Sequence, residues 1–141
     1  MTVSTFAASG SPATLAPGDY QPGVCNIGPA EIARRRRAGH IGVVAALALL
    51  ALLVAIDAPN WTRLLIAIPA VMAASGYIQA RLKFCAGFGS RGVFNFGEVG
   101  PMERVAGEAD RARDRARARQ IGAASIAIGL AAGVIAATLP I

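Results

Sequence analysis

The two cysteines are the residues of this chain with the clearest capacity for chemistry. Cys25 and Cys85 are the only thiols among its 141 residues, and basic residues lie close to both in the sequence. A thiol beside cationic side chains gains thiolate character, which redox and sulfur-transfer reactions require. Two cysteines and the single histidine, His40, do not complete the four ligands of a structural zinc site. We therefore expect packing as the first role of Cys25 and Cys85, with a thiol pair in redox or sulfur handling as the alternative.

A glycine pattern between residues 84 and 101 matches a known phosphate-binding motif. Gly87, Gly89 and Gly92 read GxGxxG, which cradles a pyrophosphate where it links a strand to a helix in a βαβ unit. Here an apolar stretch of membrane-spanning length precedes the motif, and no βαβ unit fits the sequence around it. The glycines are thus better interpreted as positions for tight backbone turns, and we expect no bound nucleotide or other cofactor.

Aromatic and basic side chains supply candidate contact surfaces. Phenylalanines of this density in a polar loop indicate docking to lipid headgroups or to a partner protein. Two arginine clusters lie next to apolar stretches, where anionic headgroups are the nearest binding partners, so we expect no nucleic acid. The residues predicted to contact lipid or a partner are Phe84, Phe88, Phe94, Phe96, Arg34, Arg35, Arg36, Arg37, Arg111, Arg115 and Arg119.

Three apolar stretches must position all of these side chains. They cover residues 38–58, 61–80 and 121–141, and each is close to the ~20 residues that a helix needs to cross a bilayer. With 55% apolar residues the chain is too hydrophobic for an ordinary soluble domain. The sequence predicts an all-α integral membrane protein with three transmembrane helices. No ionisable residue lies in the middle of a span, which argues against a pump or an ion-coupled transporter.

The distribution of charge predicts the topology. Of the 14 basic residues, only Arg63 lies in the short connection at residues 57–63, where the second span begins, and the other thirteen precede span one or lie between spans two and three. Basic residues near span ends stay in the cytoplasm, so the N-terminus and the long middle segment are expected inside and the C-terminus outside. We expect a multi-pass protein of the bacterial cytoplasmic (inner) membrane, with Cys25 and Cys85 on its cytoplasmic side.

Five segments follow from these patterns. Residues 1–23 hold one charge and many small polar residues, which predicts a disordered tail. Residues 24–37 are expected to form a basic interfacial helix, with Asn26 or Gly28 as its cap, and residues 38–80 a transmembrane hairpin kinked at Pro69. Residues 81–101 are expected to form a Gly/Phe-rich cytoplasmic loop, and residues 102–141 an Arg-rich helix that continues into the third span.

The Arg-rich segment has two opposing charge patterns. Glu108 with Arg111, Asp110 with Arg113, and Asp114 with Arg117 are favourable pairs three residues apart. The arginines of the stripe named above are spaced four residues apart and repel one another. We therefore expect an anionic surface or an acidic partner to face that stripe.

Small residues line one face of the third span. A face of this kind allows two helices to approach closely in a membrane, as in the GxxxG pattern. The predicted packing residues are Gly122, Ser125, Gly129, Gly133 and Ala137. We expect this face to bind a helix of another membrane protein or of a second copy of the chain.

A family resemblance accompanies the predicted hairpin. The motifs CNIGPAEIARR before it and KFCAGFGSRGV after it contain Asn26, Gly28, Arg34, Phe84, Cys85 and Gly92. With these motifs, residues 25–93 resemble the small two-helix inner-membrane domain associated with bacterial rhodaneses, although Ala86 stands where those domains usually have proline. The resemblance implies a membrane hairpin and, through the cysteine, a sulfur-related role.

Three functional classes remain open from the sequence. The first is a non-enzymatic accessory, assembly or interaction subunit of a membrane complex. The second is a thiol-based redox or sulfur-handling membrane protein that uses Cys25 and Cys85. The third is a small-solute carrier or channel subunit.

Overall fold

The computed structural model describes residues 20–141, which form helices joined at one end by a small irregular unit. The predicted tail up to residue 19 lies outside the described residues. The elements in chain order are α1 (Pro29–Ala55), the 3-10 helix η1 (Asn60–Ile66), α2 (Ala67–Leu82), α3 (Ala86–Arg91), β1 (Val93–Phe94), β2 (Glu103–Arg104) and α4 (Glu108–Thr138).

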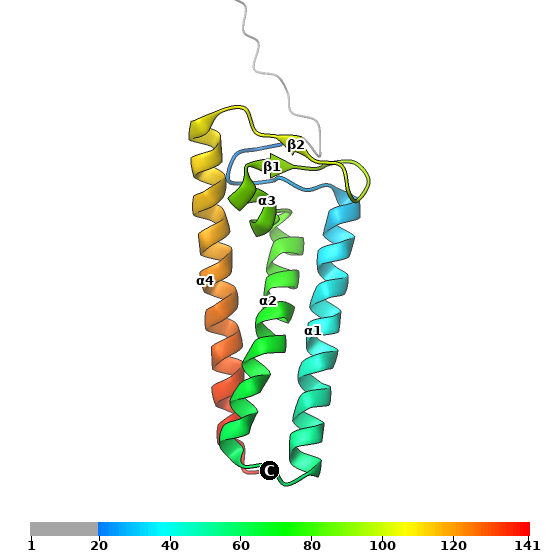
Figure 1. Cartoon of the computed structure of the whole chain (residues 1–141), viewed down its shortest axis with the longest axis vertical. Helices are drawn as coiled ribbons and strands as arrows, with labels where there is room; N and C mark the ends of the chain where they lie inside the picture. The colour runs from blue at the N-terminus through cyan, green and yellow to red at the C-terminus, as the bar shows by residue number, and fades with distance from the viewer. Residues whose placement is uncertain (1–19) are drawn as a thin grey trace, which may run out of the picture.

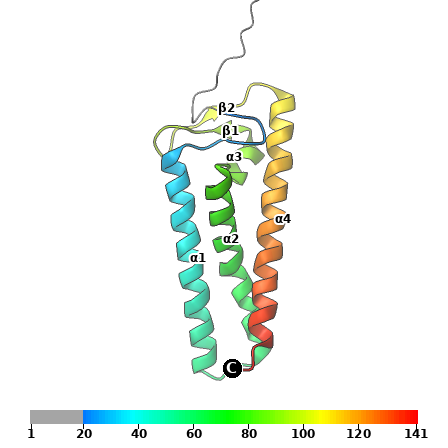
Figure 2. The same ribbon diagram turned by 180° about the vertical axis from the view of Figure 1, so that it is seen from behind.

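Three helical segments are long and apolar enough to cross a membrane: α1, η1 with α2, and α4. This confirms the predicted number of spans. The all-α description needs a correction, because β1 and β2 pair as a two-stranded antiparallel sheet. The helix α2 lies between α1 and α4 and packs against both, as the two opposite views in Figures 1 and 2 show.

Helix α1 includes both the basic segment and the first span. The boundary predicted between residues 37 and 38 is therefore wrong: one continuous helix begins at Pro29. Of the two predicted caps, Asn26 and Gly28, it is Gly28 that forms the N-cap. Pro29 occupies the first turn, where a backbone N–H has no partner within the helix and its absence costs nothing. A Cβ on Gly28 would lie 2.6 Å from the Phe96 carbonyl oxygen, so only glycine fits this cap.

The second span is divided rather than kinked within an α-helix. Pro69 lies in the first turn of α2, just after η1 ends at Ile66. Proline has no N–H for the carbonyl of Leu65, four residues earlier, and the preceding residues adopt the tighter 3-10 geometry instead. The irregularity predicted at Pro69 is thus present, and it lies just before the proline.

Close backbone contact joins α1 to α2. A Cβ on Gly42 would lie 2.5 Å from the Ala73 nitrogen, and a Cβ on Gly76 would lie 2.5 Å from the Gly39 nitrogen. All four residues are buried. Small residues therefore let these helices approach closely, which is how helices associate in a membrane without a hydrophobic driving force.

The small face of α4 packs within the chain. Gly129 contacts Val71, Gly133 contacts Ala67 and Leu64, and both glycines are buried together with Ser125. Two of the predicted packing residues lie off this face: Gly122 has open space where a Cβ would be, and Ala137 is only half-buried. The prediction that this face binds a separate helix is wrong, because α2 already occupies it.

A polar cap closes the end of the bundle at which α1 and α4 begin. We define the cap as residues 20–28 and 83–107. Residues 20–28 cross from α4 toward α1, where Ile27 pairs in parallel with Asn95. Residues 20–23, predicted as part of a disordered tail, are held in the cap, because Gly23 and Tyr20 both bond to a side chain of α4. The predicted loop at residues 81–101 contains α3 and β1.

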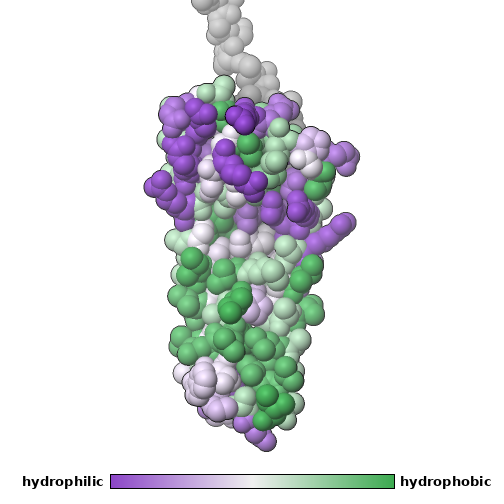
Figure 3. Space-filling model, viewed as in Figure 1, coloured by the Kyte–Doolittle hydropathy of each residue, from purple (hydrophilic) through white to green (hydrophobic). Residues whose placement is uncertain are grey.

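The surface divides along the long axis. Figure 3 shows hydrophilic residues over the cap end, a broad hydrophobic zone over the helices, and a small polar patch at the hairpin end. The hydrophobic zone includes exposed Ile41, Val44 and Leu47 on α1 and Ile126 and Leu130 on α4. This arrangement is typical of a multi-pass membrane protein.

Candidate functional site

Asn26 and Cys85 form the centre of the cap. The Asn26 side-chain amide donates to the Cys85 carbonyl at 3.1 Å, and its oxygen accepts the Cys85 N–H at 2.6 Å. The backbone N–H of Asn26 donates to the Lys83 carbonyl at 3.1 Å. Both Asn26 and Cys85 are buried. The segments before and after the hairpin are thus joined into one hydrogen-bonded corner.

The Cys85 sulfur receives two donors. It accepts a hydrogen bond from Arg35 Nη2 at 2.9 Å and another from the Phe88 N–H at 3.4 Å, so that Cys85 caps the N-terminus of α3. The Arg35 guanidinium also lies 5.8 Å from the centre of the Phe88 ring. Cys85 is 2% exposed, so this cluster lies inside the cap.

A buried carboxylate lies beside this sulfur. Glu31 is 1% exposed, and its oxygens lie 3.6 Å from Arg35 and 3.8 Å from Arg34. Each of these distances is longer than a hydrogen bond, and Glu31 Oε2 and Arg35 Nε are buried without a hydrogen-bond partner among the described residues. Two arginines therefore share one carboxylate, which leaves an excess of positive charge here.

Cys25 lies apart from this cluster. Its thiol is half-buried and donates weakly to the Ile27 carbonyl at 3.9 Å. Burial raises the pKa of the Cys25 thiol, and the Ile27 bond and the nearby Lys83 charge oppose that effect. Both cysteines are free thiols, so they form no disulfide with each other.

The phenylalanines predicted to contact lipid or a partner divide into two groups. Phe84 and Phe88 are 0% and 6% exposed, so the prediction is wrong for them. Phe84 packs with Ala118 and Ile121 of α4, and Phe88 packs with Ile27 and Cys85. Phe94 and Phe96 are half-buried in the cap, where Phe94 stacks on Tyr20 with ring centres 4.8 Å apart.

The glycine pattern belongs to this packing. Gly89 lies against the Phe84 ring, where a Cβ would come within 2.7 Å of it, and Gly92 ends α3 in the left-handed region with φ 68°. Gly87 lies inside α3, so no strand-to-helix turn is formed. The interpretation of these glycines as turn and packing positions is consistent with this geometry.

The predicted arginine contacts also divide. Arg34, Arg36, Arg37 and Arg119 are exposed, whereas Arg35 is turned inward. Arg111 and Arg115 both bind Glu108, at 3.0 and 2.6 Å. The expectation that Arg111 and Arg115 need an external anion is thus corrected, because one carboxylate of the chain lies between them.

Asp114 has a structural role that was not predicted from the sequence. It was expected to pair with Arg117, yet it is fully buried and accepts hydrogen bonds from the Tyr20 hydroxyl at 2.8 Å and the Gly23 N–H at 2.7 Å. The other two predicted pairs are present, Glu108–Arg111 at 3.0 Å and Asp110–Arg113 at 3.8 Å. Asp114 therefore anchors the start of the cap to α4.

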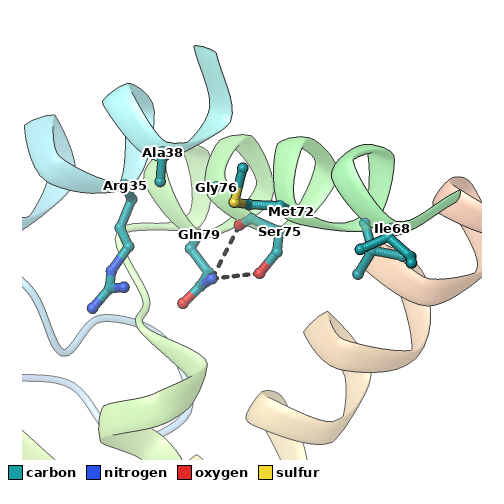
Figure 4. Close-up of a pocket in the computed structure, with 8 residues that line it drawn as sticks. Arg35, Ala38, Ile68, Met72, Ser75, Gly76 and Gln79 are labelled. Atoms are coloured by element: carbon teal, nitrogen blue, oxygen red, sulfur yellow. Dashed lines mark hydrogen bonds between the residues drawn. The ribbon is translucent and has the colours of Figure 1, made fainter. Parts of the chain in front are cut away.

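A groove of about 340 Å³ opens on α2 below the cap. Its lining consists of Arg35 and Ala38 of α1 with Ile68, Val71, Met72, Ser75, Gly76 and Gln79 of α2. Figure 4 shows Arg35 and Gln79 at one end of this space and Ile68 at the other. The Gln79 amide donates to Ser75 Oγ at 2.7 Å and to the Ser75 carbonyl at 3.1 Å, and its oxygen accepts the Ala86 N–H at 2.9 Å.

The groove and the Cys85 cluster share Arg35, and together they form the candidate site. Sequence reasoning placed Arg35 among four equivalent arginines and did not single out Gln79 or Glu31. Within residues 20–141, no three of the His, Cys, Asp and Glu side chains gather as metal ligands would. Comparisons with protein-family models, with curated proteins and with solved structures give no significant match to this chain.

Proposed function

We propose that this chain is a non-enzymatic accessory, assembly or interaction subunit of a complex in the bacterial cytoplasmic membrane. The supporting observation is that buried polar residues of the cap are hydrogen-bonded within the chain. Asn26, Cys85 and Asp114 are buried and engaged in hydrogen bonds that join the cap to the helices. A cap built in this way is a fixed platform for whatever its outer face binds.

The surface of the cap and of the helix segments next to it is basic. Arg36, Arg37, Arg81, Arg91 and Arg119 are exposed, and none of them forms an ion pair with another residue of the described part of the chain. Unpaired surface charges of one sign attract surfaces of the opposite sign over roughly a Debye length, ~8 Å at physiological salt. Anionic headgroups and an acidic partner surface are the two proposed contacts.

The same charges support the proposed orientation. Thirteen of the 14 basic residues lie at the cap end, and only Arg63 lies at the hairpin end. Arg63 is 3% exposed and donates to the carbonyl of Leu139 at 3.0 Å and to that of Ile141. The positive-inside rule then assigns the cap to the cytoplasm and the hairpin end to the outside.

Purification from native membranes tests this function. The tagged chain is extracted in a mild detergent, and the proteins that remain bound are identified by mass spectrometry. We expect a stoichiometric membrane protein that is lost when Arg36 and Arg37 are both changed to Gln. The exposed Asp57 at the opposite end supplies the control, since Asp57→Asn should leave the partner bound. Recovery of the chain alone, or only with itself, would contradict the proposal.

One observation favours the thiol-based alternative. The Arg35 guanidinium lies 2.9 Å from the Cys85 sulfur, so a cation directly faces this thiol. The substitution Cys85→Ser separates the two functions, because serine is a good N-cap and can keep the start of α3 in place. A thiol function requires Cys25 and Cys85 and is lost in either serine variant. An interaction subunit keeps its partner in both.

A further inference from the structure

We propose that the groove on α2 binds one acyl chain of an anionic glycerophospholipid, with the lipid phosphate held by Arg35. This inference goes beyond the proposed interaction function and does not depend on it. It requires only that the three helices lie in a bilayer with the cap at one membrane surface.

The dimensions of the groove match one leaflet. Its lining on α2 runs from Ile68 to Gln79, and the eleven helical steps between these residues cover about 16 Å along a helix axis. Half of the ~30 Å hydrocarbon core is about 15 Å. A chain that enters at the cap end therefore reaches the middle of the bilayer at Ile68.

The groove exists because of how the three helices meet. Both α1 and α4 pack against α2 and not extensively against each other, so one face of α2 stays uncovered between them. Close contact at Gly42 and Gly76 on one side and at Gly129 on the other fixes α2 in this position. The opening is thus a fixed feature of the packing.

The groove is apolar at one end and polar at the other, as a lipid is. Ile68, Val71 and Met72 line the deep part, and the polar side chains of Ser75, Gln79 and Arg35 line the part nearest the cap (Figure 4). The amide of Gln79 is already engaged with Ser75 and Ala86. Arg35 is therefore the lining residue with unused donors for a phosphate.

Local charge favours an anionic headgroup. Arg34 and Arg35 share the Glu31 carboxylate at 3.8 and 3.6 Å, and no other acidic side chain of residues 20–141 pairs with either arginine. A guanidinium binds a phosphate through charge-assisted hydrogen bonds, which are about twice as strong as those between neutral groups. A phosphate at this end would offset the excess positive charge.

Size argues for a lipid chain over a helix of a second protein. A helix with its side chains is about 10–12 Å across, so a 16 Å length of it fills more than about 1,000 Å³. The groove holds about 340 Å³. One acyl chain is the narrower occupant, and the groove accepts it without separation of α1 from α4.

Native mass spectrometry of the full chain in mild detergent tests the proposal. Phosphatidylglycerol and phosphatidylcholine with identical acyl chains are added in turn, and the bound fractions are compared. We expect wild type to prefer phosphatidylglycerol, and Arg35→Gln to lower that preference by about tenfold or more, the loss of one or two hydrogen bonds to a charged group. Arg104→Gln removes the same charge at an exposed residue of β2, away from the groove, and should keep the preference. Equal losses in both variants, or no preference in wild type, would overturn the proposal.

Two further variants test the acyl chain and the fold. Met72→Trp fills the groove and should reduce the binding of both lipids, whereas Leu47→Trp, on the exposed outer face of α1, should not. Arg35→Lys keeps the charge and should keep the preference for phosphatidylglycerol, which shows that the loss in Arg35→Gln is not caused by misfolding. Inorganic phosphate is the last probe. If it displaces phosphatidylglycerol while Met72→Trp binds normally, the site holds free phosphate and the lipid proposal is wrong.

Discussion

The side chain of Asn26 pairs with the backbone of Cys85 as a neighbouring β-strand would. It binds the carbonyl and the N–H of the same residue, at 3.1 and 2.6 Å, across 59 residues of sequence. This pair of hydrogen bonds joins the segment before α1 to the segment after α2. It therefore closes the cap on the hairpin, and it brings Cys85 within reach of Arg35.

We expect Asn26→Ala to destabilise the fold by about 1–3 kcal/mol, because it leaves the buried Cys85 N–H without a partner, while the Cys85 carbonyl keeps its hydrogen bond from the Gly89 N–H. Asn26→Asp should be at least as damaging, since a carboxylate cannot donate to the Cys85 carbonyl and would be buried at 0% exposure. The measurement is thermal unfolding in detergent. Asn60→Ala, an exposed asparagine at the hairpin end, is the control. Equal melting temperatures for Asn26→Ala and Asn60→Ala would show that the corner contributes little.

Tyr20→Phe should loosen the start of the cap while leaving the helices folded. It removes the hydrogen bond to the buried Asp114, at 2.8 Å, and keeps the stacking on Phe94. The expected cost is about 1–3 kcal/mol, and it should appear as faster hydrogen exchange over residues 20–28. Tyr77→Phe removes an exposed hydroxyl that bonds to His40 at 2.6 Å and should not change exchange in the cap.

The same contact predicts a dependence on alkaline pH. Burial, and then the bond and charge of Asp114, raise the pKa of Tyr20 above its ordinary value of about 10. The folded state therefore favours the protonated hydroxyl, so its contribution is complete below about pH 10 and is lost as pH rises further. The protection of residues 20–28, which is the intrinsic exchange rate of an unfolded chain relative to their own rate at the same pH, should therefore fall above pH 10 in wild type, beyond the general rise of exchange with pH. If Tyr20→Phe shows the same loss of protection, another group is responsible.

Hydropathy and charge alone predicted the three spans, because long apolar helices are the main way for a chain to satisfy its backbone in lipid. They did not predict the cap. Asp114 has an arginine three residues away in sequence, but it binds Tyr20, 94 residues distant. Phe84 and Phe88 lie in a polar, glycine-rich stretch and yet are buried. Such long-range pairings depend on which groups find partners once the helices have packed.

The small residues of the third span illustrate the same limit. Their type correctly predicted close helix packing, and the neighbour is α2 of the same chain rather than a separate protein. Sequence periodicity identifies a face, while the choice of partner depends on the tertiary arrangement. An equally close contact between α1 and α2 involves Gly39, Gly42 and Gly76. It was not predicted, because these glycines lie in stretches that are apolar throughout.

We expect Gly76→Ala to prevent normal packing of α1 on α2. A Cβ at residue 76 would lie 2.5 Å from the Gly39 nitrogen, in a rigid part of the backbone. The variant should lose most of its monodisperse peak in size-exclusion chromatography. Gly122→Ala makes the same change in a helix where no atom lies within 4 Å of the new Cβ, so it should behave as wild type. Similar profiles for the two variants would contradict the packing described for α1 and α2.

Thiol labelling distinguishes the roles of the two cysteines. Cys85 is 2% exposed, so in the Cys25→Ser variant we expect maleimide to label it only after unfolding. Cys25 is half-buried and burial raises its thiol pKa, so in the Cys85→Ser variant it should label more slowly at pH 7 than the same chain in denaturant. Its rate should rise with pH, because more of the thiol becomes thiolate. If native Cys85 labels at pH 7 as fast as Cys25, the cap opens to solvent. An accessible Cys85 thiol beside Arg35 would then favour the thiol-based function over the interaction subunit.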